Sequence, residues 1–173
     1  MKDNNKLSYY DRATRELMER ANDYNGMMVG NYTLPYVVAA LREAFKQKLT
    51  YKKVFSDDDF YRYYPSKQDP AQDFCLISSY YIYARTGADK VWDIRRSGYH
   101  WWLQFKGWSE PFDITFTQFV EPHQRAHMTY DYFIKHWEPY TNWGIERRIP
   151  TDTDFTEDVA RRASILGKYA GLE

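Results

Sequence analysis

The chain has little of several features that define large classes of protein. It contains one cysteine among 173 residues, so no internal disulfide can form, and this is typical of a protein that folds in a reducing compartment. Lysine plus arginine and aspartate plus glutamate both number 24, which leaves a formal net charge of zero. Because nucleic-acid and membrane-surface proteins usually carry a basic excess, the composition gives no strong signal for either partner.

Long apolar runs are also absent. No stretch approaches the roughly 18 consecutive apolar residues that a membrane-spanning helix requires. The opening segment, MKDNNKLSYYDRATRELMER, contains no apolar stretch of the signal-peptide type. We therefore expect a cytoplasmic protein without membrane association. The length favours one domain, residues 1–173, which can bury a sizeable core without disulfides or a structural metal.

Aromatic side chains, in contrast, are abundant, with 17 Tyr, 10 Phe and 6 Trp making up 19% of the residues. Two interpretations of this composition remain open. The rings can fill the core while the tyrosine hydroxyl groups reach the surface. They can also line a groove that binds a peptide, a nucleotide or a partner protein.

Apolar residues at helical spacing predict helices toward both ends of the chain. Ser8 is a good N-cap for a first helix, which Gly26 would end. Thr33 can cap a second helix, with Pro35 tolerated in its first turn. The stretches expected to be helical are SYYDRATRELMERANDYNG (8–26), TLPYVVAALREAFKQKL (33–49), MTYDYFIKHWEPY (128–140) and TDTDFTEDVARRASILGKYAGL (151–172).

The middle of the chain combines one helical pattern with three strand patterns. Residues Cys75 to Ala84 are expected to form a helix, with Asp73 as its N-cap and Gly87 as its stop. Aromatic and β-branched residues predict strands over VWDI (91–94), HWWLQF (100–105) and FDITF (112–116). Helices on both sides of a run of strands indicate an α+β fold, with helices packed on a small antiparallel sheet.

Cys75, the only cysteine, is a candidate nucleophile. A thiol attacks as the thiolate, and free cysteine has a pKa of about 8.5. The unpaired N–H groups at a helix N-terminus favour an anion, and a histidine that takes the proton favours it further. An Asp73 cap would place Cys75 in the first helical turn. His100 follows 25 residues later, and Asp113 lies thirteen residues beyond it.

The hairpin between the second and third predicted strands brings the histidine and the aspartate together. A two-residue turn at Lys106-Gly107 would place His100 directly opposite Asp113, on the same face of the sheet. There the carboxylate would fix the imidazole tautomer and stabilise its charged form. Pro111, inside the third strand, requires an edge position or a longer loop. This order and geometry favour a triad of the cysteine, the histidine and the aspartate.

Other interpretations of the same residues remain open. A lone cysteine is most often an inert part of a core. A zinc site would need closely spaced ligand pairs, and His123 and His127 are the nearest to such a pair, without an obvious third ligand. The acidic triplet at residues 57–59 is more typical of a solvated charge run than of a metal site. We expect neither a metal nor a cofactor.

Two stretches, PAQDFCLISSYYIYARTG (70–87) and HWWLQFKGWSEPFDITFTQF (100–119), resemble the YunG-like family of small bacterial and phage proteins. That family has a cysteine at the start of an apolar helix, and a later His-aromatic strand that leads into an Asp-Leu-Thr-x-x-Gln-Phe segment. DITFTQF, residues 113–119, is similar to that segment. The similarity covers residues 34–173, which implies a YunG-like core ending in a C-terminal helix, with residues 1–33 as an N-terminal helical extension. Asp73-Phe74 stands where the family often has Gly-Gln.

The wider pattern is similar to papain-like and transglutaminase-like thiol enzymes, and this resemblance implies roles for particular residues. Cys75 would be the nucleophile, His100 the general base and acid, and Asp113 the orienting residue. The backbone N–H of the cysteine and a side-chain amide, that of Gln72, would hold an oxyanion. Gln118 is the next polar candidate and would rather support the aspartate loop. The side chains that could line a substrate groove are Tyr99, Trp101, Trp102 and Trp108.

These resemblances lead to two hypotheses about function. The first is a thiol-dependent amide or acyl hydrolase, deamidase or acyltransferase that works through a thioester on a protein, peptide or small amide or acyl substrate. The second is a catalytically silent binding protein on the same fold, whose aromatic surface captures a ligand in a phage–host contest. An exposed aromatic patch away from Cys75, together with a fully buried Cys75, would favour the second hypothesis.

Overall fold

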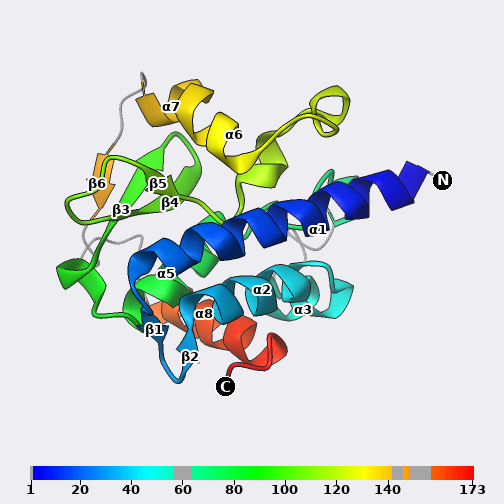
Figure 1. Ribbon diagram of the computed structural model, residues 1–173. Helices are drawn as coiled ribbons and strands as arrows, with labels where there is room; N and C mark the ends of the chain where they lie inside the picture. The colour runs from blue at the N-terminus through cyan, green and yellow to red at the C-terminus, as the bar shows by residue number, and fades with distance from the viewer. Residues whose placement is uncertain (1, 57–63, 142–145, 149–156) are drawn as a thin grey trace.

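The computed structural model describes residues 2–56, 64–141, 146–148 and 157–173 (Figure 1). The protein is α+β, with helices packed on a small antiparallel sheet. The α-helices are α1 (Lys2–Ala21), α2 (Leu34–Phe45), α3 (Lys48–Val54), α5 (Cys75–Ala84), α6 (Tyr130–His136), α7 (Glu138–Thr141) and α8 (Glu157–Tyr169). The strands are β1 (Met28–Val29), β2 (Tyr32–Thr33), β3 (Trp92–Ser97), β4 (His100–Phe105), β5 (Pro111–Phe112) and β6 (Glu146–Arg148). The acidic triplet at 57–59 lies outside the described residues.

The main sheet is antiparallel, with strand order β5-β4-β3-β6, and β1 and β2 form a separate hairpin. Helix α5 packs on β3 and β4 and also against α8, so it connects the sheet to the last helix. Helix α1 crosses the front of the molecule and contacts α2 and α6 (Figure 1). In the part of the chain that the structure describes, no helix is long and apolar enough to cross a membrane.

The helices follow the predicted apolar spacing, but their ends differ from the expected ones. The first helix begins at Lys2 rather than after Ser8. The helix expected over 33–49 does start directly after Thr33, but it ends at Phe45. Gln47 has an extended backbone, with φ −91° and ψ 120°, and α3 starts after it. The expected helix therefore ends four residues early, and only its last two residues, Lys48 and Leu49, belong to the next helix.

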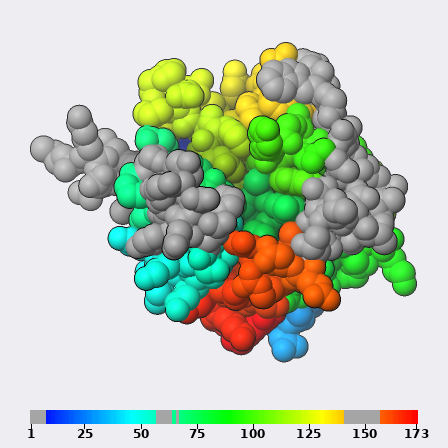
Figure 2. Space-filling view, turned by 180° about the vertical axis from the view of Figure 1, so that it is seen from behind, coloured from blue at the N-terminus to red at the C-terminus, as the bar shows by residue number. Residues whose placement is uncertain are grey.

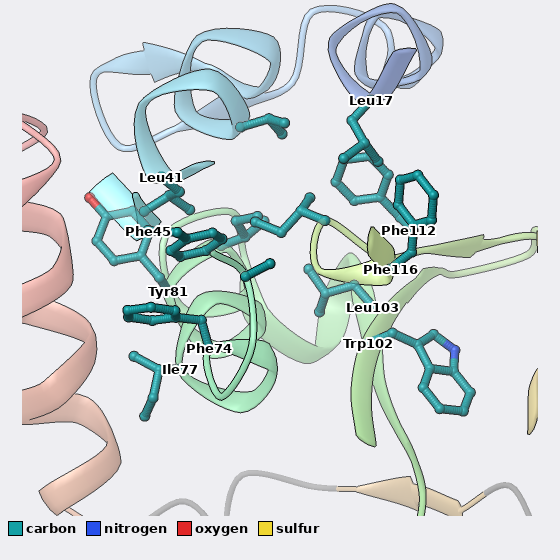
Figure 3. Close-up of a cluster of buried hydrophobic side chains, with 14 of the residues drawn as sticks. Leu17, Leu41, Phe45, Phe74, Ile77, Tyr81, Trp102, Leu103, Phe112 and Phe116 are labelled. Carbon is teal, nitrogen blue, oxygen red and sulfur yellow. The ribbon is translucent and has the colours of Figure 1, made fainter. Parts of the chain in front are cut away.

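A single cluster of buried apolar side chains connects the helices with the sheet (Figure 3). Phe45 and Phe74 stack with ring centroids 4.4 Å apart, which joins α2 to the segment before α5. Tyr10 and Leu17 of α1 are buried in the same cluster. Residues 1–33, predicted to be an extension, therefore supply part of the common core. Many of the aromatic residues are core residues, whereas the Tyr99 side chain is fully exposed.

The pairing of β4 with β5 is shifted by two residues from the predicted register. Leu103 lies opposite Phe112, whereas a turn at Lys106-Gly107 would have placed it opposite Glu110. The predicted two-residue turn is wrong, because the connection between the strands is longer. Pro111 lies on β5, the edge strand of the sheet, where its missing N–H is tolerated. Side chains alternate with a period of two, so a shift of two keeps each side chain on its expected face.

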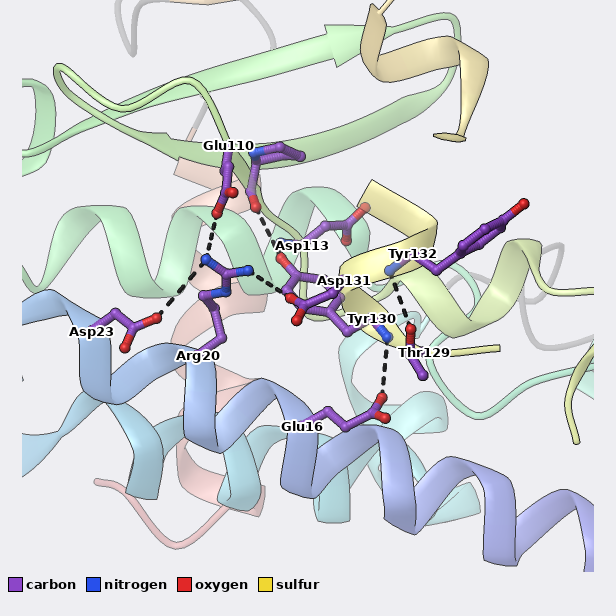
Figure 4. A network of polar contacts seen from close by, with 10 residues as sticks. Glu16, Arg20, Asp23, Glu110, Asp113, Thr129, Tyr130, Asp131 and Tyr132 are labelled. Atoms are coloured by element: carbon purple, nitrogen blue, oxygen red, sulfur yellow. Dashed lines mark hydrogen bonds and ion pairs between the residues drawn. The ribbon is translucent and has the colours of Figure 1, made fainter. Parts of the chain in front are cut away.

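A network of ion pairs and hydrogen bonds connects α1 with α6 and with the start of β5 (Figure 4). Arg20 of α1 forms ion pairs with Glu110, in the loop before β5, and with Asp131 of α6. Tyr130 of α6 donates its hydroxyl to the Pro111 carbonyl at 2.9 Å. Its oxygen also accepts the backbone N–H of Asp113 at 3.2 Å. The backbone that carries this aspartate is therefore fixed by contacts from two helices.

Candidate functional site

Cys75 is the first residue of α5, so it lies in the first helical turn as the sequence predicts. The expected Asp73 cap is wrong, because Phe74 occupies the N-cap position and no side chain caps the helix. Asp73 instead has a left-handed backbone, with φ 77°, and its carboxylate accepts the Tyr51 hydroxyl at 2.8 Å. The first intrahelical bond is the one from Ser78 N–H to the Phe74 carbonyl. The N–H groups before it, including that of Cys75, have no carbonyl partner within the helix and point toward the helix N-terminus.

His100 and Asp113 are in direct contact. The distance from His100 Nε2 to Asp113 Oδ2 is 2.5 Å, and the two residues are 5% and 2% exposed. Asp113 lies one residue beyond the end of β5, which is shorter than the strand expected over 112–116, so the two residues are not a cross-strand pair and meet where the chain leaves the sheet. The structure therefore brings these two predicted site residues together, although not through the predicted cross-strand pair.

The Asp113 carboxylate is surrounded by hydrogen-bond donors. Thr115 donates its N–H at 2.9 Å and its hydroxyl at 3.0 Å to Oδ1. Tyr140 donates its hydroxyl at 2.5 Å to Oδ2, the oxygen that also contacts His100. Burial alone would raise the pKa of Asp113, but the His100 charge and these donors outweigh burial and lower it. The carboxylate is therefore held as an anion.

The same contact changes the acid–base behaviour of the histidine. Burial lowers the pKa of His100, but the charge and hydrogen bond of Asp113, together with an interaction with Cys75, raise it to about 9. Nε2 is occupied by the aspartate, so Nδ1 is the nitrogen left to exchange a proton. In the described part of the chain, buried Nδ1 has no hydrogen-bond partner. With a pKa of about 9, the ring holds a proton at Nδ1 and is charged at neutral pH, which favours a thiolate beside it.

Cys75 lies beside this ring. Its sulfur is 3.8 Å from the carbonyl oxygen of Tyr99, the residue just before His100. The thiol is half-buried, and its interaction with the imidazole is among the causes that raise the His100 pKa. The structure therefore gathers the predicted cysteine, histidine and aspartate around one imidazole.

Aromatic rings hold the imidazole in place. The Phe119 ring is 4.4 Å from the His100 ring and the Trp137 ring is 5.4 Å from it, both at 75°. Trp102 stacks on the same imidazole at 5.5 Å and 24°. These rings exclude water, and a low dielectric strengthens the pairing with the buried carboxylate.

A cavity of about 800 Å³ opens at Cys75 and His100. The predicted groove residues Tyr99 and Trp101 line it. Trp102 and Trp108 do not, contrary to expectation. The first is buried behind the imidazole, and the second stacks on Tyr24 at 4.8 Å. Figure 2 shows the face on which the orange start of α8 lies close to the green atoms of α5 and the β3–β4 hairpin.

The two glutamine predictions have different outcomes. Gln72 does not line the cavity, and its side-chain oxygen accepts the backbone N–H of Gln68 at 3.1 Å. Gln118 does line the cavity. Its amide nitrogen is buried and has no hydrogen-bond partner among the described residues. Buried N–H groups nearly always have a hydrogen-bond acceptor. The Gln118 amide is an exception, a donor without an acceptor among the described residues. The cavity therefore contains Gln118, the second oxyanion candidate, and does not contain Gln72, the first.

A buried arginine, which was not among the predicted site residues, links the segments that carry the site. Arg42 of α2 donates to the Ile114 carbonyl at 2.6 Å and to the Thr117 hydroxyl at 3.4 Å. Thr117 in turn donates to Asp69, in the segment leading to α5, at 2.9 Å. The sequence contains a signal for it, since Arg42 stands in the apolar stripe of its helix, beside Leu41. Tyr140 has no comparable local signal.

In the described ranges, no group of three or more His, Cys, Asp or Glu side chains is placed to hold a metal ion. His123 lies in the short 3₁₀ helix Pro122–Gln124, and His127 follows in a turn.

Comparisons of the chain with protein-family models, curated proteins and solved structures found no match.

Proposed function

We propose that this protein is a thiol-dependent acyl or amide enzyme with a papain-like or transglutaminase-like arrangement, in which Cys75, His100 and Asp113 form the catalytic triad. The observation that carries the proposal is the imidazole itself. Its Nε2 is 2.5 Å from a buried carboxylate, and its Nδ1 is unpartnered among the described residues, beside a thiol at a helix N-terminus. A carboxylate that fixes one nitrogen leaves the other to act as the base.

The first chemical step forms a thioester. In the resting enzyme the Cys75 proton is already held at His100 Nδ1, and the thiolate attacks the carbonyl carbon of an ester or amide. The resulting oxyanion accepts hydrogen bonds from the Cys75 backbone N–H and the Gln118 amide. When the tetrahedral intermediate collapses, the carbon–oxygen or carbon–nitrogen bond breaks, and the imidazolium returns its proton to the leaving group.

The second step releases the acyl group. His100 takes a proton from water, and the hydroxide attacks the thioester carbonyl carbon. The carbon–sulfur bond breaks, the acid product leaves, and the proton returns to the Cys75 thiolate. An amine in place of water would give acyl transfer by the same sequence of bonds. Asp113 stays ionised throughout, because it has four donors and lies beside a charged ring.

A catalytically silent binding protein finds less support. That function would be favoured by a fully buried Cys75, but the thiol is half-buried and lines the cavity. An amide donor without an acceptor and a raised His100 pKa are also features that ligand binding alone does not require.

The experiment that tests the proposal is acylation by p-nitrophenyl acetate, followed by intact mass and release of p-nitrophenolate. We expect a burst of p-nitrophenolate equal to one enzyme equivalent, and one acetyl group on Cys75. His100→Ala should lose the burst, and Cys75→Ser should show no mass change. Acetylation only at lysine or tyrosine, with no burst, would contradict the proposal.

A further inference from the structure

The cavity next to Cys75 has a mostly apolar wall built by elements far apart in the sequence. Its volume of about 800 Å³ lies within the range of about 300–1,000 Å³ that small-molecule sites occupy. The apolar side chains that form the wall are Phe55, Leu76, Trp101, Phe119, Trp137 and Val159. A site of this size and composition gains most from a ligand that removes apolar surface from water.

The charged groups of the wall are matched within the protein, beginning with His100, whose charge is paired with buried Asp113. Arg162 donates to Asp158 at 2.7 Å and to the Val54 carbonyl at 2.7 Å, so its charge is matched within the protein. The hydrogen bonds from Arg162 and Arg161 lower the pKa of Asp158 and keep it ionised. Asp73 adds another carboxylate to the wall. A ligand carboxylate or phosphate would enter this space without a free counter-charge among the described lining residues.

We propose that the acyl group accepted by Cys75 is neutral and apolar, with a chain or side chain of about six or more carbon atoms. This inference rests on the proposed function, because the acyl carbonyl must lie at the sulfur while the apolar part fills the cavity. Two sources share this chemistry: a linear fatty-acyl chain, and a large apolar side chain of a peptide. In both, the carbon–sulfur bond forms when the thiolate adds to the carbonyl, and the bond to the leaving group breaks when the tetrahedral intermediate collapses.

The test compares the initial p-nitrophenolate bursts of four p-nitrophenyl esters, all below their aggregation concentrations. The four are the acetate, the octanoate, the monoester of suberate and the ester of N-benzyloxycarbonyl-phenylalanine. Because each methylene moved from water into an apolar site favours binding about fourfold, the octanoate should acylate at least about 30-fold faster per unit concentration than the acetate. The suberate monoester has the same chain length but ends in a carboxylate, and it should react at least about tenfold more slowly than the octanoate.

The fourth ester separates the two sources. A faster reaction with the octanoate assigns the site to a linear acyl chain, and a faster reaction with the phenylalanine ester assigns it to an apolar peptide side chain. If the acetate reacts as fast as both, or the suberate as fast as the octanoate, the inference is overturned while the thiol mechanism stands. If no ester acylates Cys75, the proposed function itself has failed.

Variants of the wall provide the matched test. Leu76 is half-buried, so Leu76→Gln should fold and should lower the ratio of octanoate to acetate acylation by at least about fivefold. Val159→Thr keeps the shape of the side chain but adds a hydroxyl, and it should lower the same ratio. Leu49 is 54% exposed and is not among the lining residues, so Leu49→Ala should leave the ratio unchanged. An unchanged ratio in both wall variants would overturn the inference.

Discussion

Tyr140 and His100 contact the same oxygen, Oδ2 of Asp113, each at 2.5 Å. Tyr140 comes from α7, which is far from both other residues in the sequence. Its hydroxyl therefore competes with the imidazole for one carboxylate oxygen, while Thr115 holds the other oxygen. The basicity of the imidazole depends on this division, because every donor that stabilises the carboxylate weakens its pull on the histidine proton.

Tyr140→Phe should raise the pKa of His100. The variant removes one of the donors that lower the pKa of Asp113, so the carboxylate should bind the imidazolium more strongly. A neutral hydrogen bond is worth about 1 kcal/mol, so the shift should be up to about one pKa unit. NMR titration of the His100 ring C–H signals would measure it. Tyr132→Phe, at an exposed tyrosine of α6, is the control and should cause no shift. A lower pKa in Tyr140→Phe would show that this hydroxyl does not compete for the carboxylate.

The His100–Asp113 pair predicts how the stability of the fold depends on pH. The pKa of His100 is raised from 6.5 to about 9, so its contribution is fully present below pH 6.5 and is lost as the pH rises through 9. The pKa of Asp113 is lowered from 3.8, so its contribution is present above that value and is lost on acidification below it. Between pH 6 and pH 9.5, we expect the free energy of unfolding to fall by on the order of 3 kcal/mol.

Urea unfolding followed by circular dichroism at the two pH values would measure this change. Asp113→Asn should remove most of the dependence, since it removes the charge that raises the His100 pKa. His136 is an exposed histidine whose Nδ1 contacts the Tyr132 carbonyl, and His136→Gln should leave the dependence in place. Equal stability of the unmodified protein at both pH values would argue against a charged, buried imidazole.

Gln118 should matter for attack on a carbonyl but not for alkylation. Its unpartnered amide can stabilise an oxyanion, which forms during acylation by p-nitrophenyl acetate and does not form with iodoacetamide. Loss of one oxyanion donor costs about 10²-fold or more in rate. Gln118→Ala should therefore slow acylation by about that factor, with the alkylation rate unchanged. Gln72→Ala should change neither rate, and equal losses in both reactions of Gln118→Ala would indicate a structural role.

Thr117 should be needed for the placement of the site, because it bridges Arg42 and Asp69. Thr117→Val keeps the side-chain shape and removes both hydrogen bonds, which should lower the free energy of unfolding by about 1–3 kcal/mol. The segments that carry Cys75 and Asp113 would then lose a shared contact, and iodoacetamide alkylation should slow. Thr86→Val, at a half-buried threonine beyond the end of α5, provides the comparison. If Thr117→Val is less stable but is alkylated at the normal rate, these hydrogen bonds stabilise the fold and do not position the site.

The local parts of the site could be predicted from the sequence, and the tertiary parts could not. Cys75 starts a helix because an apolar segment follows it, and this remains true although Phe74 occupies the N-cap position instead of Asp73. His100 and Asp113 meet despite a register error and although β5 ends at Phe112, because a shift of two residues keeps Phe112 on its expected face and Asp113 follows it directly. Tyr140 could not be predicted, since its contact depends on how α6 and α7 pack. Trp102 and Trp108 show the same limit, because residue type does not separate a ring lining a cavity from one in the core.

The transfer of the Cys75 proton to His100 is tested most directly by the pH dependence of iodoacetamide alkylation of the native protein. The chain has a single cysteine, so one alkyl group by intact mass reports on Cys75 alone. The proposed mechanism predicts that alkylation proceeds readily at pH 6, at a rate at least about tenfold above that of His100→Ala, because the thiolate is the reactive species. Equal rates in the two proteins, or alkylation only after unfolding, would contradict it and leave Cys75 as a packed, inert thiol.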